Sequence, residues 1–98
     1  MTARFVLTPR AQADLDAIWD YTEARWGIAQ AENYLRQLGR DLQRVAEHPT
    51  IGTDCADIRP GYCEHPSGAH VLFCRLTADG IDVVRIFHER MDPDRHIP

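Results

Sequence analysis

Six residues in the second half of the chain are of types that together could cleave RNA. They are Arg59, Glu64, Arg75, Arg85, His88 and Arg90. A glutamate or histidine can move the protons of such a reaction, and arginines can stabilise the negative charge that develops around the phosphorus atom. The alternative is that these residues form salt bridges on an open sheet face and anchor a partner. Composition alone favours this second interpretation.

Nucleophilic and cofactor-dependent chemistry find little support in the residue types. Ser67 is the only serine, no acid–histidine pattern is legible around it, and the chain has neither a phosphate-binding loop nor a dinucleotide fingerprint. We therefore expect no cofactor and no nameable catalytic residue. The protein is expected to act by binding and not as an enzyme.

The cysteines, Cys55, Cys63 and Cys74, form no CxxC pair. With His65 and His70 they could be imagined as a zinc site, but the spacing matches no common zinc pattern. Reduced thiols and no metal are the expectation.

Bulk composition describes one small domain, residues 1–98, with a net charge of −4 and a pI near 5.6. This charge argues against non-specific binding to nucleic acid. All 11 basic residues are arginine, which excludes any mechanism that needs a lysine. No apolar run is long enough to cross a bilayer and the N-terminus lacks the apolar core of a signal peptide, so the expected location is the cytoplasm.

A β-hairpin is predicted within residues 69–92, and the rest of the chain must position its side chains. Residues 71–76 and 81–87 are apolar runs rich in β-branched and aromatic residues, and the Asp79-Gly80 pair between them is typical of a tight turn. Near-continuous apolar runs indicate strands in the centre of a sheet. Arg75 and Arg85 interrupt them, so each should reach a polar surface or a partner.

Two helices are predicted upstream, over Thr8–Trp26 and Ile28–His48. Thr8 followed by Pro9 is a helix start signal, Gly27 is a stop signal, and apolar residues recur at helical spacing in both segments. The expected helix core is Leu15, Ile18, Trp19, Leu35, Leu38 and Leu42, packed against Val71, Phe73, Val84 and Ile86. Trp26 is expected in the core, or partly exposed at the helical corner.

The remaining segments complete an α+β fold. Residues 4–8 are a strand candidate, 50–57 a loop, 58–62 the start of a third extended segment, and 66–68 a turn. The order is β-α-α-β-β-β, and the simplest solution is a small antiparallel sheet with an N-terminal helical hairpin packed on one face.

The chain resembles the ParE toxins of the ParE/RelE superfamily, the plasmid-stabilisation toxins of type II toxin–antitoxin systems. The motifs that carry the resemblance span almost the whole chain: Leu7-Thr8-Pro9-Arg10-Ala11, Asp14-Leu15, Ile18-Trp19-Asp20-Tyr21, Trp26-Gly27, Ala31, Tyr34, His48-Pro49, Ile51-Gly52, Ile58-Arg59-Pro60-Gly61-Tyr62, Ser67-Gly68-Ala69-His70 and Val84-Arg85-Ile86-Phe87-His88-Glu89-Arg90-Met91-Asp92. Their order and spacing together are specific.

Membership of this family implies the fold already reached, inhibition of DNA gyrase with growth arrest, and neutralisation by a ParD-type antitoxin. The RelE branch instead cleaves ribosome-bound mRNA, using basic residues and often a C-terminal tyrosine. No tyrosine follows Tyr62 and no lysine occurs, which disfavours that activity. Family members often carry basic residues where this chain has residues 63–66, Cys-Glu-His-Pro, so an attenuated remnant that only binds its antitoxin is a further alternative.

The site expectations follow from the residues and the resemblance. Arg59, Arg75 and Arg85 are the expected anchors for the antitoxin's C-terminal segment, on the open sheet face and in the groove beside the helical hairpin. The expected gyrase-binding surface is Arg85, His88, Arg90, Met91 and Asp92, together with the tail to Pro98.

Overall fold

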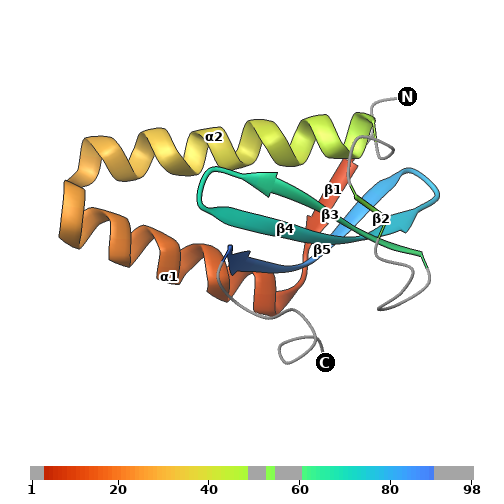
Figure 1. Ribbon diagram of the computed structural model, residues 1–98, viewed down its shortest axis with the longest axis horizontal. Coiled ribbons are helices and arrows are strands. Elements are labelled where there is room, and N and C mark those ends of the chain that lie inside the picture. The colour runs from red at the N-terminus through yellow and green to blue at the C-terminus, as the bar shows by residue number, and fades with distance from the viewer. Residues whose placement is uncertain (1–3, 49–52, 55–60, 90–98) are drawn as a thin grey trace.

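The computed structural model describes residues 4–48, 53–54 and 61–89, which form two helices and one sheet (Figure 1). The helices are α1 (Pro9–Trp26) and α2 (Ile28–Glu47). The strands are β1 (Arg4–Leu7), β2 (Thr53–Asp54), β3 (Tyr62–Ser67), β4 (His70–Thr77) and β5 (Gly80–His88). This confirms the α+β class. Within the described ranges, neither helix is long and apolar enough to cross a membrane.

Both helices begin and end where the start and stop signals predict. The Thr8 hydroxyl caps α1 by accepting a hydrogen bond from the Ala11 amide at 3.1 Å, and Pro9 is the first helical residue. The Thr8 hydroxyl also donates to the Val84 carbonyl at 2.8 Å, so the cap joins α1 to β5. Gly27 separates the helices, which diverge from this corner in Figure 1.

The sheet has the strand order β1-β5-β4-β3-β2, so β4 and β5 lie in its interior, as predicted. It is not wholly antiparallel, because β1 pairs with β5 in parallel. Parallel neighbours require a long connection, and here the two helices are part of it. The two-residue strand β2, which pairs with β3, falls within the segment predicted as loop.

Two turn predictions need correction. Pro66 belongs to β3, opposite Val71, and the tight turn contains Gly68 and Ala69. Gly80 opens β5 instead of completing the turn. A Cβ at Gly80 would lie 1.8 Å from the Arg4 carbonyl oxygen, so glycine is needed for the close approach of β1.

The main core lies between the helices and one sheet face. Its buried members are Ala11, Ile18, Leu38, Leu42, Val45, Ala46, Cys63, Leu72, Cys74, Ile81, Val83 and Ile86, with Leu15 and Leu35 partly buried against them. Phe73 and Phe87 form a second buried cluster with Tyr62 and Val84. The prediction that Phe73 and Val84 pack against the helices is therefore wrong. Trp19 is only half-buried, and Trp26 is 63% exposed.

An irregularity in the pairing of β4 with β5 explains part of this error. Phe73 lies opposite Arg85 but Cys74 lies opposite Val83, so Val84 is an extra residue. Such a bulge resets the alternation of side chains between the two faces. Val83 and Ile86 therefore both belong to the core beneath the helices, whereas Val84 joins the other cluster.

Candidate binding groove

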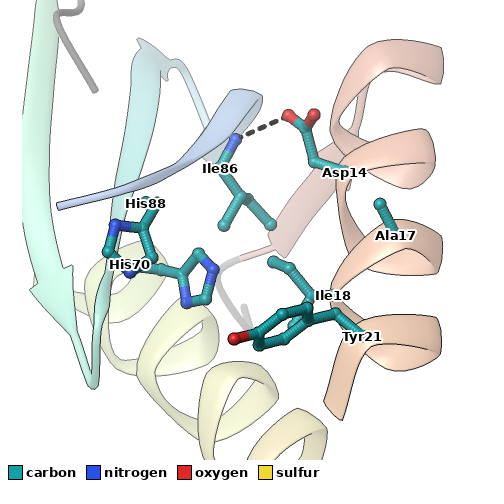
Figure 2. A pocket seen from close by; sticks show the side chains of 7 residues that line it. All are labelled: Asp14, Ala17, Ile18, Tyr21, His70, Ile86 and His88. Atoms are coloured by element: carbon teal, nitrogen blue, oxygen red, sulfur yellow. Dashed lines mark hydrogen bonds between the residues drawn. The ribbon is translucent and has the colours of Figure 1, made fainter. Parts of the chain in front are cut away.

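A groove runs along α1 beside the ends of β4 and β5. It contains two hollows, of about 420 Å³ and about 220 Å³, which share Tyr21, His70 and His88. The larger is lined further by Asp14, Ala17, Ile18 and Ile86, and the smaller by Thr22, Trp26, Gln30, Tyr34 and Ala69. Figure 2 shows Tyr21 reaching from α1 toward the two histidine rings. We call this surface the histidine groove.

The histidine pair is positioned by strand register. His70 at the start of β4 lies opposite His88 at the end of β5, and their ring centroids are 5.5 Å apart in an edge-on arrangement. The Glu89 amide donates to the Ala69 carbonyl at 2.9 Å, which holds the start of β4 against the end of β5. Both rings therefore belong to a hydrogen-bonded sheet end, a more rigid support than a loop.

Tyr34 of α2 fixes His70 and the turn before it. The Ala69 amide donates to the Tyr34 hydroxyl at 3.0 Å, and that hydroxyl lies 2.6 Å from His70 Nδ1. The hydroxyl therefore accepts from the Ala69 backbone and shares a second hydrogen bond with His70 Nδ1, which joins the ring to the turn. A Cβ at Gly68, whose φ is +58°, would lie 2.7 Å from the same hydroxyl, so only glycine fits there.

This environment keeps both groups neutral. Burial, followed by the charge of neighbouring His88, lowers the pKa of His70, while Glu89 and Asp14 partly oppose the shift. Burial raises the pKa of Tyr34, with a smaller contribution from Glu89. Tyr34 is therefore a hydrogen-bond donor at neutral pH, and the pair has no activated nucleophile.

The lowered pKa of His70 predicts acid sensitivity. The unfolded chain takes up a proton at this residue near the ordinary value of 6.5, whereas the folded chain does so only at lower pH. The stability that neutral His70 contributes is thus complete above 6.5 and falls as the pH falls below it. His70→Asn, whose amide oxygen can still accept from Tyr34, should reduce this loss in urea unfolding measured across that range. The same change at exposed His48 should leave it in place, and an unaltered loss in His70→Asn would contradict the prediction.

Asp14 joins the groove to the sheet. Its carboxylate accepts from Arg85 Nε at 2.8 Å, from Arg85 Nη2 at 3.1 Å and from the Ile86 amide at 2.9 Å. The side chains of Asp14 and Arg85 are only 17% and 15% exposed. The Arg85 guanidinium also lies 4.9 Å from the centre of the Phe87 ring. These contacts bind α1 to β5 at the wall of the groove.

Exposed apolar side chains lie at and beside the helical corner, next to the groove. Tyr21, Trp26 and Ile28 are 65%, 63% and 57% exposed. The Arg25 guanidinium lies 5.5 Å from the Trp26 ring centre. Tyr21 and Trp26 themselves line the hollows, so their exposed rings form an apolar rim of the groove, and Ile28 is a further exposed apolar residue at the helical corner. Clustered exposed aromatic residues of this kind are typical of protein-binding surfaces.

The predicted site residues are dispersed. Arg75 pairs with Asp82 on the neighbouring strand, Arg85 pairs with Asp14, and His88 lines the groove. Arg59, Arg90, Met91 and Asp92, with the tail to Pro98, lie outside the described residues. Of the three predicted anchors, Arg75 and Arg85 are described by the structure, and each forms an ion pair within the chain.

Arg75 and His88 lie toward opposite ends of the central hairpin. His88 pairs with His70, and Arg75 lies five positions further along β4. At the rise of a β-strand this places their backbones about 16 Å apart. The Arg75 side chain is instead paired with Asp82 on the neighbouring strand. The RNA-cleaving set proposed from residue types alone is therefore not brought together among the described residues.

Sequence reasoning did not identify Asp14, Tyr21 and Tyr34 as site residues, and it named His70 only in a zinc pattern that it set aside. Tyr21 and Tyr34 lie on different helices, and only the folded hairpin brings them to His70. One signal is visible in the sequence. Tyr21 is an aromatic residue outside the predicted apolar face of the first helix, and in the structure it is 65% exposed. In the described part of the chain, no three histidine, cysteine or acidic side chains gather as metal ligands.

Comparisons with known proteins identify one family. The family model described as "ParE toxin of type II toxin-antitoxin system, parDE" matches residues 5–93. The chain is 52% identical over 98 residues to Toxin ParE1 of Mycobacterium tuberculosis (strain CDC 1551 / Oshkosh), covering 99% of this chain and 100% of that protein. It is 41% identical over 91 residues to Toxin ParE1 of Caulobacter vibrioides, covering 93% and 94%.

A solved structure shares the fold. It is described as the chromosomal ParDE TA system from P. aeruginosa and superposes with a TM-score of 0.74, covering 89% of this chain and 96% of that one. The two chains are 20% identical, so this likeness concerns the fold alone.

Proposed function

The chain belongs to the ParE toxins of type II toxin–antitoxin systems, and from this premise we propose that it inhibits DNA gyrase in the cytoplasm by binding and is neutralised by a ParD-type antitoxin. The family resemblance supports both partners. The mode of action is a non-enzymatic contact between proteins.

One observation supports action by binding and not by catalysis: several polar side chains are paired with one another, whereas apolar side chains at the rim of the groove are exposed. Asp14 pairs with Arg85, Asp82 with Arg75, and Tyr34 with His70. The groove rim, in contrast, exposes Tyr21 and Trp26. Catalysis needs a base and a charge stabiliser within reach of the same reacting atom, whereas recognition needs apolar area with a few polar contacts.

The antitoxin is proposed to lie along the histidine groove and the open sheet face. Its apolar side chains would enter the hollows beside Tyr21 and Trp26, and its carboxylates would pair with arginines at the edges. Residues 63–66, which depart from the family pattern, take part in β3, and Cys63 is only 5% exposed. Its side chain therefore cannot supply much of that contact.

Removing the anchor charges should weaken antitoxin binding. The triple variant Arg59→Gln, Arg75→Gln and Arg85→Gln is expected to raise the Kd at least about tenfold, which corresponds to about 1.4 kcal/mol. Arg40→Gln is the matched control, because Arg40 bonds to Gln37 on its own helix. Titration calorimetry on variants with verified folding is the measurement. An unchanged Kd in the triple variant would remove these arginines from the interface.

The gyrase surface is proposed to be Arg85, His88, Arg90, Met91 and Asp92, with the tail to Pro98. His88 is exposed and is the last residue of β5. Deleting residues 92–98 should abolish growth inhibition while the thermal unfolding of the protein stays nearly the same.

The test of the proposal is a supercoiling assay with purified gyrase and no ribosomes, beside a cleavage assay on ribosome-bound mRNA. Inhibition of supercoiling without mRNA cleavage is the expected result. His88→Gln should weaken inhibition by less than about tenfold, since glutamine keeps the shape and hydrogen bonding of a contact residue. Cleavage of mRNA that disappears in His88→Gln, with intact supercoiling, would instead establish a ribonuclease with His88 as its base. Silence in both assays with retained antitoxin binding would identify an attenuated remnant.

A further inference from the structure

Cys63 and Cys74 face each other across the β3–β4 pair, and we propose that they form a reversible intramolecular disulfide when the protein meets an oxidising low-molecular-weight disulfide. The two residues are directly paired in the strand register. Both belong to the buried core beneath the helices, so their side chains leave the sheet on the same face. The proposal concerns a modification site and is independent of the toxin's target.

The backbone separation suits such a bond. The Leu76 amide donates to the Gly61 carbonyl at 3.0 Å, and this pair lies two steps from Cys63 and Cys74 along the same ladder. Pair types alternate along antiparallel strands, so the cysteines occupy a hydrogen-bonded pair with Cα atoms about 5.5 Å apart. Disulfides span Cα separations of about 4.4–6.8 Å.

The side-chain separation predicts a bond that is easily reduced. Opposed Cβ atoms in a sheet are about 4.5–5.5 Å apart, and a hydrogen-bonded pair such as this one lies toward the upper end of that range, above the roughly 3.5–4.5 Å found in disulfides. Closing the bond therefore requires β3 and β4 to approach each other by about 1 Å or more at this pair. Strained disulfides have higher reduction potentials and are the labile or regulatory ones.

Access to the thiols comes through β3. Cys63 is 5% exposed and Cys74 is 0% exposed, so the oxidant must reach them through local opening. Among the residues that the structure describes, β3 is paired on its outer side at Glu64 and Cys63, with Thr53 and Asp54 of the two-residue strand β2. A strand held by so short a neighbour opens more readily than one in the centre of a sheet.

The reaction needs one co-reactant. The Cys63 thiolate attacks one sulfur of oxidised glutathione and releases one glutathione thiolate. The Cys74 thiolate then attacks the Cys63 sulfur of the mixed disulfide and releases the second. Two thiol protons pass to the solvent and then to the two glutathione molecules, and two electrons pass from the cysteines to the oxidant. The product joins β3 to β4 covalently.

The test is oxidation of the folded protein by oxidised glutathione, followed by mass spectrometry without reduction. The expected product is a monomer that has lost the mass of two hydrogen atoms and reverts with dithiothreitol. A protease that cuts after acidic residues releases the three cysteines in separate fragments, because Asp57 and Glu64 lie between them. The fragments containing Cys63 and Cys74 should be the linked ones, and the oxidised protein should unfold at a higher temperature than the reduced one.

Controls test whether formation of the disulfide depends on the folded structure. Cys55→Ser should form the same disulfide at the same rate, and oxidation of urea-unfolded protein should give mixed pairings that include Cys55. Cys74→Ala should yield no intramolecular product under native conditions. A native product that links Cys55, a product that stops at bound glutathione, or a protein that does not react would each overturn the proposal.

Discussion

Replacing Asp14 with asparagine is expected to lower the free energy of unfolding by about 2–4 kcal/mol. The amide keeps the shape of the side chain and can still accept the Ile86 amide hydrogen, but the Arg85 guanidinium loses its nearest counter-charge while it is 15% exposed. Breaking a largely buried pair from one side costs more than the pair contributes, because the remaining charge stays desolvated. Urea unfolding followed by circular dichroism measures the change.

Asp16→Asn is the matched control for Asp14→Asn. Asp16 lies two residues further along the same helix and is exposed. Its carboxylate accepts a hydrogen bond from the Gln12 side-chain amide, one turn earlier, at 3.1 Å. It should change the free energy of unfolding by less than about 0.5 kcal/mol. Equal effects at the two positions would mean that the Asp14–Arg85 pair does not stabilise the fold. The comparison also helps to interpret Arg85 variants with reduced toxicity. Asp14→Asn removes the ion pair that Arg85 makes in the fold but leaves the arginine itself in place.

Replacing Leu38 with alanine is expected to cost about 2–5 kcal/mol, the usual range for truncating a buried leucine. Leu38 is 1% exposed in the core between α2 and the sheet. The loss combines the transfer of the removed methyl groups to water with the cavity that the helices and sheet cannot close. Thermal and urea unfolding should agree on the loss.

Ile28→Ala provides the comparison for Leu38→Ala on the same helix. Ile28 is 57% exposed at the helical corner, so its truncation removes little buried surface and should cost less than about 0.5 kcal/mol. A loss at Leu38 below that value would show that this face of α2 does not pack against the sheet.

The helices were predictable because their signals are local. Thr8, Pro9 and Gly27 mark their ends through hydrogen bonds and backbone angles made within a few residues. Leu38 and Leu42 lie on one face through helical spacing alone. The α+β class followed from the order of the elements.

The faces of the central strands could not be predicted with the same certainty. Strands that are apolar on both sides carry no alternation that says which side meets the helices, so the sequence pattern places Phe73 on the wrong face. The bulge at Val84 then changed the alternation within β5. A bulge of this kind depends on pairing with another strand, so the sequence of β5 alone does not reveal it.

The candidate groove was only partly foreseen. The sequence indicates His88 and Arg85 as contact residues, but the Asp14 that pairs with Arg85 lies 71 positions earlier in the chain. The Tyr34–His70 contact likewise joins residues 36 positions apart. Such pairings depend on the three-dimensional arrangement of α1, α2 and the hairpin, which local patterns do not encode.

The pairing of β1 with β5 affects how the protein folds as it is synthesised. Thr8 and Val84 are bonded across 76 positions of sequence, and the Arg4 amide donates to the Asp79 carbonyl at 2.9 Å. At ordinary translation rates, the ribosome takes about 4–15 s to add the residues between these strands. During that interval β1 lacks the strand with which it pairs in the folded protein. A message truncated before the codon for Gly80 therefore yields a chain that cannot complete the sheet, and the toxin fold arises only once nearly the whole chain has left the ribosome.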